Sequence, residues 1–259
     1  MDLTNGNYYS PQAASRFWSV SQFKAFNRCE AAGLAEVRGE YVRPESDALL
    51  VGSYVDAYFS GELDKFRERH AEQMFTKKGE LYSKFYQADA MIEAIENQPL
   101  MKEYLTGNKQ EVRTGIMFGV PWKIKMDVCN GERIVDLKTV KDFNDIYDPD
   151  YGSRRSWIEF WGYDIQGAVY QTIEWLSSGR EEKLPFYIVA VTKERIPDVD
   201  IIEIPQDYLD AAIDLVGAKI ERFDLIKNGE VEPIRCGHCD YCRSTKKLTE
   251  VSRYKLREE

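Results

Sequence analysis

Two short segments near the middle of the chain carry the residue types that metal-dependent hydrolysis requires. Residues 122–128 have the sequence Trp-Lys-Ile-Lys-Met-Asp-Val, and residues 133–139 have the sequence Arg-Ile-Val-Asp-Leu-Lys-Thr. In both, apolar and polar residues alternate with the period of two that is typical of a β-strand. An Asn-Gly pair between the segments favours a hairpin turn. We expect pairing of the two strands to bring Asp127, Asp136 and Lys138 onto one surface, because residues two apart share a strand face.

Two carboxylates beside an ammonium group are suited to binding Mg²⁺ or Mn²⁺ and to hydrolysing a phosphodiester. Mg²⁺ prefers oxygen ligands, and two nearby aspartates repel each other unless a cation lies between them. A bound metal ion polarises a phosphoryl oxygen and lowers the pKa of its bound water. Lys138 would orient that water or stabilise the charge of the transition state. The alternative is a hairpin whose polar face is simply solvated.

A helix expected further along the chain extends this pattern. Residues 163–175 have helical spacing, and Gln166 and Tyr170 are four apart, so they share one face. Two strands carrying Asp and Asp-x-Lys, followed by a Gln-x-x-x-Tyr helix, resemble the PD-(D/E)xK nuclease superfamily and its RecB-like branch. Residues 19–29, which begin Ser-x-Ser and end in Cys, are similar to the opening helix of that branch. Residues 50–57 are similar to the Gly-x-x-x-His segment of the phage and prophage exonuclease VIII (RecE-type) group.

The resemblance, which spans roughly residues 18–245, implies a role for each motif residue. The implied catalytic residues are Asp127, Asp136, Lys138, Gln166 and Tyr170. The two aspartates would bind the metal ion together with the backbone carbonyl of Leu137. The glutamine, through its amide, and the tyrosine, through its hydroxyl or ring, would position the scissile strand.

Two further acidic residues are candidates for the metal site. Relatives of the RecE type carry a metal-binding His at the position that Asp56 occupies here. A carboxylate can replace that His for a hard cation, and the alternative is an ordinary surface residue on a helix. Glu111 lies just before the run from Val112 to Gly119, where it offers another carboxylate or is an exposed residue at the strand end.

The charge balance limits how this chain can bind DNA. The 259 residues include 35 Lys and Arg against 44 Asp and Glu, which gives a net charge of −9. Because sequence-independent DNA binding depends on neutralising phosphates, we expect contact at one local groove rather than over a positive surface. The basic residues expected to contact DNA are Lys123, Lys125, Arg154 and Arg155. Each pair is also compatible with an ordinary mixed-charge surface.

Four of the five cysteines form a third candidate site: Cys29, Cys236, Cys239 and Cys242. We expect the fifth, Cys129, to be a buried or turn thiol that follows the Asp127 strand. In some RecB-like nucleases, including the AddB type and the CRISPR adaptation nucleases, one early and three late cysteines hold a 4Fe–4S cluster. The resemblance therefore implies a cluster held by Cys29 and by the late Cys-x-x-Cys-x-x-Cys run. Zinc would accept the same four sulfurs, or three of them with His238. Ordinary reduced thiols are the remaining alternative.

The periodicity elsewhere predicts an α/β fold of the α+β type, with a central mixed β-sheet flanked by helices around a restriction-endonuclease-like core. We predict helices over 19–38, 47–60 and 79–97 and from 205 onward, and strands over 111–128, 133–140, 185–193 and 199–204. We expect one nuclease domain over 1–259, with a mainly helical part (1–105) arching over the cleft, a catalytic core (106–230) and a Cys-containing segment and tail (231–259). With no apolar run of membrane-spanning length and no signal-peptide pattern, we expect a cytoplasmic protein of a bacterial host cell.

The expected activity is that of a Mg²⁺- or Mn²⁺-dependent exodeoxyribonuclease resembling exonuclease VIII. By resemblance, such an enzyme digests linear double-stranded DNA from its 5′ ends and leaves 3′ single-stranded overhangs. A single-strand annealing protein then binds the overhangs during phage-type homologous recombination. The resemblance also implies a homo-oligomeric ring that threads DNA. Two alternatives stay open: a single-strand or flap nuclease with an iron–sulfur cluster, like the CRISPR adaptation nucleases, and a non-catalytic DNA-binding scaffold.

Overall fold

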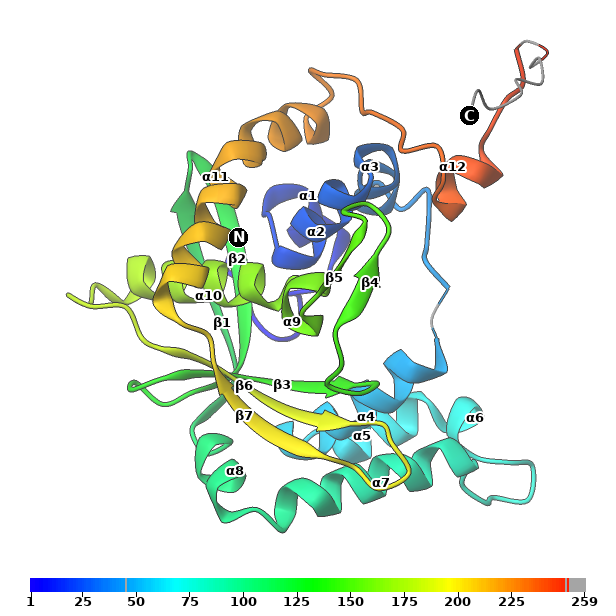
Figure 1. Cartoon of the computed structure of the whole chain (residues 1–259), viewed down its shortest axis with the longest axis vertical. Coiled ribbons are helices and arrows are strands. Elements are labelled where there is room, and N and C mark those ends of the chain that lie inside the picture. The colour runs from blue at the N-terminus through cyan, green and yellow to red at the C-terminus, as the bar shows by residue number, and fades with distance from the viewer. Residues whose placement is uncertain (45, 250, 252–259) are drawn as a thin grey trace.

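The centre of the molecule is a five-stranded mixed β-sheet (Figure 1), in a computed structural model that describes residues 1–44, 46–249 and 251. In spatial order the strands are β1 (Asn108–Met117), β2 (Val120–Cys129), β3 (Ile134–Val140), β6 (Phe186–Thr192) and β7 (Val199–Glu203). β3 and β6 run parallel, and the other neighbours are antiparallel. A separate two-stranded sheet consists of β4 (Ile146–Asp148) and β5 (Ser153–Arg155). The expected fold class, a mixed sheet flanked by helices, is confirmed.

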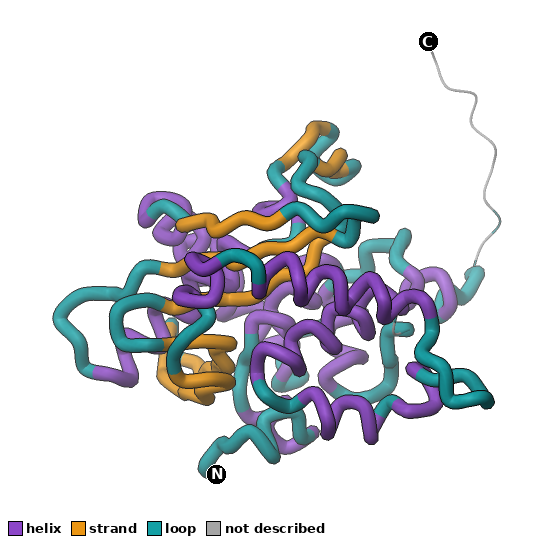
Figure 2. The backbone as a smooth tube through the Cα atoms, turned by 90° about the horizontal axis from the view of Figure 1, so that it is seen from below, coloured by secondary structure: helices purple, strands orange, loops and turns teal. Residues whose placement is uncertain are grey.

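Helices precede the sheet in the chain and also follow it. The N-terminal helices are α1 (Pro11–Arg16), α2 (Val20–Arg28), α3 (Glu30–Val37), α4 (Asp47–Ser60), α5 (Leu63–Arg69), α6 (Ala71–Met74), α7 (Ser83–Glu96) and α8 (Pro99–Tyr104). The later helices are α9 (Trp157–Phe160), α10 (Tyr163–Ser178), α11 (Gln206–Lys227) and α12 (Asp240–Ser244). Seen from below, helices lie in front of the strands (Figure 2).

The central strand β3 contributes to an apolar layer on each side of the sheet. Ile134 and Val140 belong to a buried cluster with residues of α2, α10 and α11, whereas Val135 and Leu137 belong to another with residues of α4 and α7. Successive side chains of a strand point to opposite faces, so a strand buried on both sides needs two such layers. This burial fixes the direction of the polar residues that lie between the apolar ones on β3.

The sheet opens between β2 and β3, and this opening positions the first aspartate. The two strands pair only at Val128–Val135 and Cys129–Ile134. Beyond these pairs the β1–β2 hairpin rises behind α10 while β3 continues below it (Figure 1). There the backbone N–H of Leu137 donates to Asp127 Oδ2 at 2.9 Å. The Asp127 carboxylate thus takes the place of a strand partner for the Leu137 N–H, and this hydrogen bond holds Asp127 beside β3.

Helix α4 packs closely against β3 because it carries a glycine at the contact. A Cβ atom on Gly52 would lie 2.7 Å from Thr139 Oγ1, which is too close for van der Waals contact. The helix is preceded by the N-cap Ser46 and followed by Gly61, whose φ of +78° is typical of a helix end. Asp56 follows Gly52 by four residues, so it lies on the same helix face and reaches the β3 side of the sheet.

Two boundaries differ from the sequence prediction for local reasons. The helix expected over 19–38 is divided into α2 and α3, because Cys29 has an extended backbone with φ −163° and ψ 111°. The strand expected over 111–128 is the β1–β2 hairpin, which turns at Phe118 and Gly119, both with positive φ. The two-stranded β4–β5 sheet was not predicted, since its strands have only three residues each.

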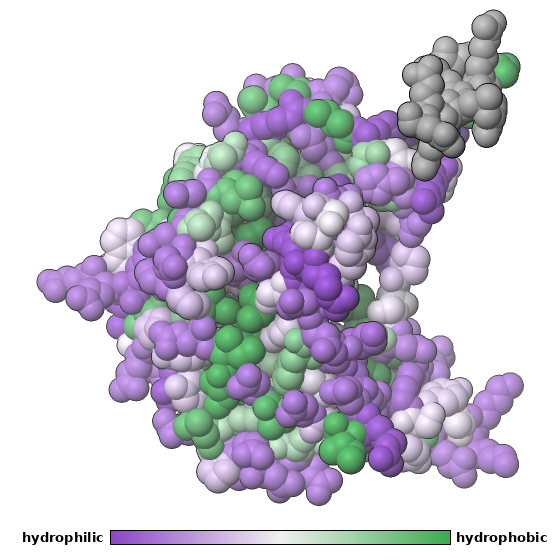
Figure 3. Space-filling model, viewed as in Figure 1, coloured by the Kyte–Doolittle hydropathy of each residue, from purple (hydrophilic) through white to green (hydrophobic). Residues whose placement is uncertain are grey.

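One face of the molecule is mostly hydrophilic and is indented between its upper and lower halves (Figure 3). Within the described ranges, none of the helices combines the length and the apolar character of a membrane span. The Cys-containing segment and tail expected over 231–259 is described only in part: α12 ends at Ser244, and residues 250 and 252–259 lie outside the described residues.

Candidate active site

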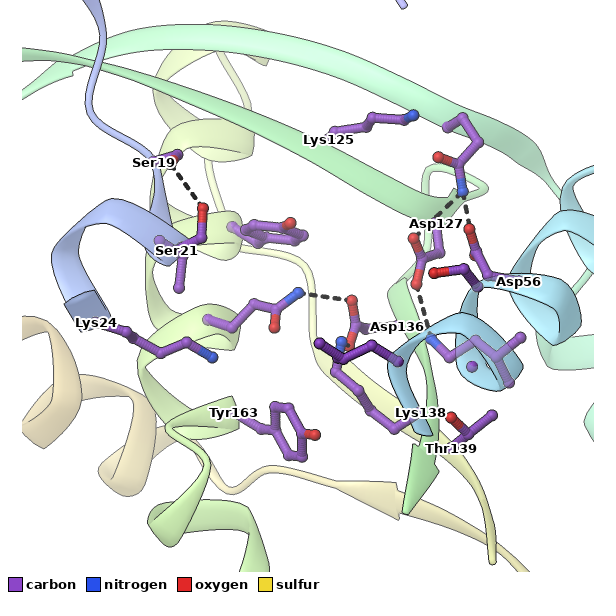
Figure 4. Close-up of a pocket in the computed structure, with 18 of the residues that line it drawn as sticks. Ser19, Ser21, Lys24, Asp56, Lys125, Asp127, Asp136, Lys138, Thr139 and Tyr163 are labelled. Carbon is purple, nitrogen blue, oxygen red and sulfur yellow. Dashed lines mark hydrogen bonds and ion pairs between the residues drawn. The ribbon is translucent and has the colours of Figure 1, made fainter. Parts of the chain in front are cut away.

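An open cleft of about 480 Å³ lies where the sheet opens, with walls from α2, α4, β2, β3 and α10 (Figure 4). The predicted site residues that line it are Asp56, Lys125, Asp127, Asp136, Leu137, Lys138, Gln166 and Tyr170. The structure therefore brings together all five residues predicted to be catalytic, although they come from two strands and a helix. It also brings Asp56 to them from the N-terminal helical part.

Asp136 and Lys138 project into the cleft from β3. Asp136 is only 2% exposed, its Oδ1 accepts a hydrogen bond from Gln166 Nε2 at 2.7 Å, and its other oxygen forms an ion pair with Lys138. Burial alone would lower the pKa of Lys138, but the carboxylates of Asp136 and Asp127 outweigh burial and raise it. Lys138 is therefore an ammonium ion at neutral pH, suited to orienting water or stabilising negative charge.

Asp127 and Asp56 form the other side of the carboxylate group. The Oδ1 atom of Asp127 accepts a hydrogen bond from Gln110 Nε2 at 3.3 Å, while Oδ2 accepts the N–H of Leu137. Burial raises the pKa of Asp127 well above its ordinary value, and the neighbouring aspartates raise it further. Burial also raises the pKa of Asp56, although the nearby lysine acts against this. The three aspartates thus lie close enough together to repel one another, and Lys138 is the cation paired with one of them.

This donor set fits a hard divalent cation. Asp56, Asp127 and Asp136 present oxygen donors only, which is the preference of Mg²⁺ and Mn²⁺. A cation between them would remove the repulsion that raises their pKa values. Leu137 lies in the cleft wall with its N–H engaged by Asp127, and a metal bond to its carbonyl stays a prediction.

Gln166 and Tyr170 reach the carboxylates from one face of α10. The amide of Gln166 donates to Asp136, so it fixes the orientation of that carboxylate. The pKa of Tyr170 is raised well above its ordinary value, first by burial and then by repulsion from Tyr8 and the aspartates. The phenol therefore stays protonated and can donate a hydrogen bond to an oxygen in the cleft.

Several residues that sequence reasoning did not single out complete the cleft, among them Tyr9, Lys24, Gln110 and Tyr163. Lys24 on α2 donates to the carbonyl of Trp161 at 2.8 Å, and burial lowers its pKa to about 8, with repulsion from Lys138 acting in the same direction. The ring centroid of Tyr163 is 5.3 Å from Lys24 Nζ and 5.0 Å from Lys138 Nζ. The Ser-x-Ser opening pointed to helix α2, but no local pattern marks Gln110 or Tyr9.

The four basic residues predicted to contact DNA have different surroundings. Lys125 lines the cleft, with Nζ 5.3 Å from the ring centroid of Tyr9. Lys123 is 4% exposed and donates to the backbone carbonyl of Tyr8, so its prediction as a DNA contact is wrong. Both lysines lie on one strand face and both meet the N-terminal segment, but Tyr8 buries Lys123 whereas Lys125 beside Tyr9 is only half-buried.

The two arginines lie on β5, outside the residues that line the cleft. Arg154 is exposed and donates to the backbone carbonyl of Asp145, whereas Arg155 forms an ion pair with Asp148 at 3.2 Å. Arg154 remains a predicted surface contact for DNA. Arg155 is paired with a buried partner, and its role as a phosphate contact stays a prediction.

Glu111 does not join the carboxylate group, which corrects its prediction as a metal ligand. Its carboxylate forms an ion pair with Arg113 at 2.7 Å, and Arg113 also lies 3.6 Å from the fully buried Glu174. Adjacent residues of a strand point to opposite faces. Gln110, its neighbour on β1, is the residue that faces the cleft.

Four of the five cysteines meet outside the cleft, where Cys29 at the start of α3 faces the segment that contains α12. The sulfurs of Cys29, Cys236, Cys239 and Cys242 all lie within 4.8 Å of one another. The backbone N–H of Cys239 donates to Cys236 Sγ at 3.3 Å, a hydrogen bond that favours the thiolate. Burial raises the pKa of Cys236, but backbone hydrogen bonds from Cys239 and His238 outweigh it and lower the pKa to about 6. This donor set fits a zinc ion or an iron–sulfur cluster, and the ring of His238 lies outside it.

The fold and the cleft together define a class of protein. A central strand carries Asp-x-Lys, the preceding antiparallel strand supplies the other aspartate, and a following helix presents Gln-x-x-x-Tyr to both. This arrangement, on a mixed sheet flanked by helices, is that of a PD-(D/E)xK nuclease.

Comparison with known proteins agrees with this class. The model of the family described as "PDDEXK-like domain of unknown function (DUF3799)" matches residues 19–245, and the chain belongs to that family. A crystal structure at 2.19 Å from Eubacterium rectale, of a protein described as a candidate exonuclease, is 42% identical with a TM-score of 0.91, over 98% of this chain and 97% of that chain. The structure of SSO0001 is 17% identical with a TM-score of 0.29, over 81% of this chain and 89% of that chain. No protein with a curated description matches.

Proposed function

We propose that this protein is a Mg²⁺- or Mn²⁺-dependent exodeoxyribonuclease that digests linear double-stranded DNA from its 5′ ends. The observation that carries the proposal is the meeting of Asp127, Asp136 and Lys138 with Gln166 in one cleft. The exonuclease character is supported by the candidate exonuclease of Eubacterium rectale, which is 42% identical over nearly the whole of both chains.

The residues of the cleft match the requirements of phosphodiester hydrolysis. Asp56, Asp127 and Asp136 would hold the metal ion, which polarises the scissile phosphate and supplies a water of lowered pKa. Lys138, kept protonated by its carboxylate neighbours, would orient the attacking water. Tyr170 would donate a hydrogen bond to a phosphate oxygen.

The cleft also offers a local path for a DNA strand on an acidic protein. Lys24 and Lys125 lie in its walls from opposite sides, on α2 and β2. Attraction limited to a few lysines gives a modest dependence of DNA affinity on salt, since that dependence scales with the number of phosphates neutralised. The resemblance to exonuclease VIII extends the proposal to 3′ overhangs, a single-strand annealing protein as partner and a homo-oligomeric ring.

The experiment that tests the proposal uses linear duplex DNA labelled separately at its 5′ and 3′ ends, with closed circular DNA as a second substrate. Mg²⁺-dependent loss of the 5′ label from linear DNA, with the circle intact, is the expected result. Addition of EDTA and the substitution Asp136→Asn should each abolish the reaction. Cleavage of the circle would contradict exonuclease action, and no cleavage of any DNA would favour a binding scaffold.

A second candidate function is favoured by the cysteine cluster. The four sulfurs match the one-plus-three set of the iron–sulfur CRISPR adaptation nucleases, which act on single strands or flaps. Visible absorbance of the purified protein, lost on reduction or chelation, together with a preference for single-stranded ends over duplex ends, would support this alternative. A colourless protein containing zinc, with duplex digestion, would exclude it.

A further inference from the structure

Gln110 on β1 connects two of the carboxylates. Its Nε2 atom lies 3.3 Å from Asp127 Oδ1 and 3.5 Å from Asp56 Oδ1. The register on either side, Lys109–Val128 and Glu111–Met126, places Gln110 directly opposite Asp127 on the neighbouring strand. Asp56 comes from α4, so the Gln110 amide joins three elements of the fold, β1, β2 and α4, around the acidic group.

The backbone of Gln110 has an unfavourable conformation. Its φ is +52°, a value that residues with a Cβ atom seldom adopt. In the described part of the chain, the other non-glycine residue with positive φ is Phe118, which lies in the β1–β2 turn where such values are usual. Gln110 instead lies within a strand whose register is unchanged around it. Strained backbone of this kind persists where surrounding contacts over-determine it, often next to a functional site.

The side chain of Gln110 completes the fixation of Asp127. One oxygen of that carboxylate accepts the Leu137 N–H, and the other accepts the Gln110 amide, so rotation of the carboxylate about its bond is restricted. The same amide approaches Asp56, and its positive end lies between two groups that would otherwise repel each other. Hydrogen-bonding partners behind metal ligands fix ligand orientation in this way.

We propose that Gln110 is a positioning residue that holds Asp56 and Asp127 in a common orientation for one divalent cation. This proposal rests on the metal-dependent nuclease proposed above. Asp56 reaches the cleft from α4, and its Oδ1 atom lies 3.5 Å from the Gln110 amide. Gln110 therefore restricts the orientation of Asp56 and holds it beside Asp127 in the metal site.

The test measures binding of Mn²⁺ without DNA, by electron paramagnetic resonance of the free ion. Gln110→Ala should raise the Kd for Mn²⁺ by roughly 10- to 100-fold, as for other partners of metal ligands. Gln110→Asn is the matched variant: Asn keeps the amide and tolerates positive φ, but its side chain is one methylene too short to span both carboxylates. It should weaken Mn²⁺ binding similarly while leaving the Tm of the metal-free protein unchanged.

A double substitution shows whether Gln110 acts through Asp56. If part of its effect passes through Asp56, Asp56→Asn combined with Gln110→Ala should weaken Mn²⁺ binding by less than the sum of the two single losses in binding free energy, with the remaining loss coming from the contact with Asp127. Independent, additive losses would overturn the proposal. So would wild-type affinity in Gln110→Ala, or a Tm of Gln110→Asn that falls together with its affinity. Absence of Mn²⁺ binding to the wild-type protein, or unchanged binding in Asp136→Asn, would instead overturn the proposed function.

Discussion

The carboxylate cleft and the cysteine cluster are both suited to metal ions, but they are built in opposite ways. The cleft draws its oxygen ligands from β2, β3 and α4, elements that are buried in the two large apolar clusters. The cysteine cluster joins Cys29, between α2 and α3, to the segment that contains α12, a helix of five residues. The apolar neighbours of the sulfurs are few, namely Ala31, Ala32 and Tyr241.

This difference shows at which site the fold organises the metal ligands and at which site a metal centre would hold the fold together. In the cleft, strand pairing and side-chain hydrogen bonds hold the carboxylates together despite their repulsion, so the fold prepares the site for a cation. At the cysteine cluster little packing holds the late segment against α3, so a metal centre would itself connect the distant parts of the chain. Loss of a ligand should therefore affect catalysis at one site and stability at the other.

The largest effect is expected from Asp136→Asn. Removing a metal ligand should lower the rate of DNA cleavage by about 10³-fold or more, because metal stabilisation of the transition state is worth several kcal/mol and each 1.36 kcal/mol is a factor of ten. The Tm of the metal-free protein should change little, since loss of the ion pair with Lys138 is offset by removal of the repulsion between Asp136 and Asp127. Single-turnover cleavage and thermal melting measure both quantities. Asp145→Asn, an exposed aspartate outside the cleft, should leave both unchanged.

Cys239→Ser should have the opposite effect, with a large loss of stability. We expect loss of the bound metal and a decrease of about 3–5 kcal/mol in the free energy of unfolding, because loss of a metal centre is one of the few changes with so large an effect. For a chain of this size the Tm would fall by roughly 10 °C. Elemental analysis and thermal melting test this, with Cys129→Ser as a control on a buried thiol outside the cluster. Equal metal content in the two variants would contradict the assignment.

A smaller, paired effect is expected from two lysines on one strand. Lys125→Ala should weaken DNA binding and reduce the slope of log K against log salt by about one, while changing stability by less than about 0.5 kcal/mol. Lys123→Ala should destabilise the protein by about 1–2 kcal/mol, because it removes the buried hydrogen bond to Tyr8. Fluorescence anisotropy at several salt concentrations and urea unfolding separate the two. Wild-type DNA affinity in both variants would mean that the strand does not contact DNA.

The smallest expected effect is the pH dependence of the free energy of unfolding. The pKa values of Asp127 and Asp56 are raised in the folded protein, mainly by burial, so the metal-free folded state binds protons more readily than the unfolded chain. The free energy of unfolding should therefore fall as pH rises from about 3.9, the ordinary aspartate value, through the raised pKa values. Mn²⁺ at 100 times its Kd should add about 2.7 kcal/mol above that range. Urea unfolding across pH tests this, and Asp127→Asn should flatten the metal-free dependence.

The motif residues were predictable because their relations are local. Asp136 and Lys138 share a face through the period of a strand, and Gln166 and Tyr170 through the period of a helix. These periods also predicted the sheet and its flanking helices. The same reasoning failed for Lys123, since strand period alone does not show that Tyr8 buries this lysine while Lys125, beside Tyr9, stays in the cleft wall.

Glu111 illustrates the same limit. The sequence showed an acidic residue near the strand, but the face it occupies depends on the register between β1 and β2. That register turns Gln110 toward Asp127 and leaves Glu111 with Arg113. No spacing rule contains this information, because it arises from the pairing of two separate segments.

The order and spacing of residues in this chain thus established the class of fold, the Asp-x-Lys strand and the Gln-x-x-x-Tyr helix face. Folding decided which of these faces meet: it brought Asp56 and Gln110 to the aspartates, gathered four distant cysteines, and withdrew Lys123 from solvent. The physical reason is that backbone periodicity acts within one element. Contacts between elements depend instead on packing of the apolar layers, on strand register and on close approach at positions such as Gly52.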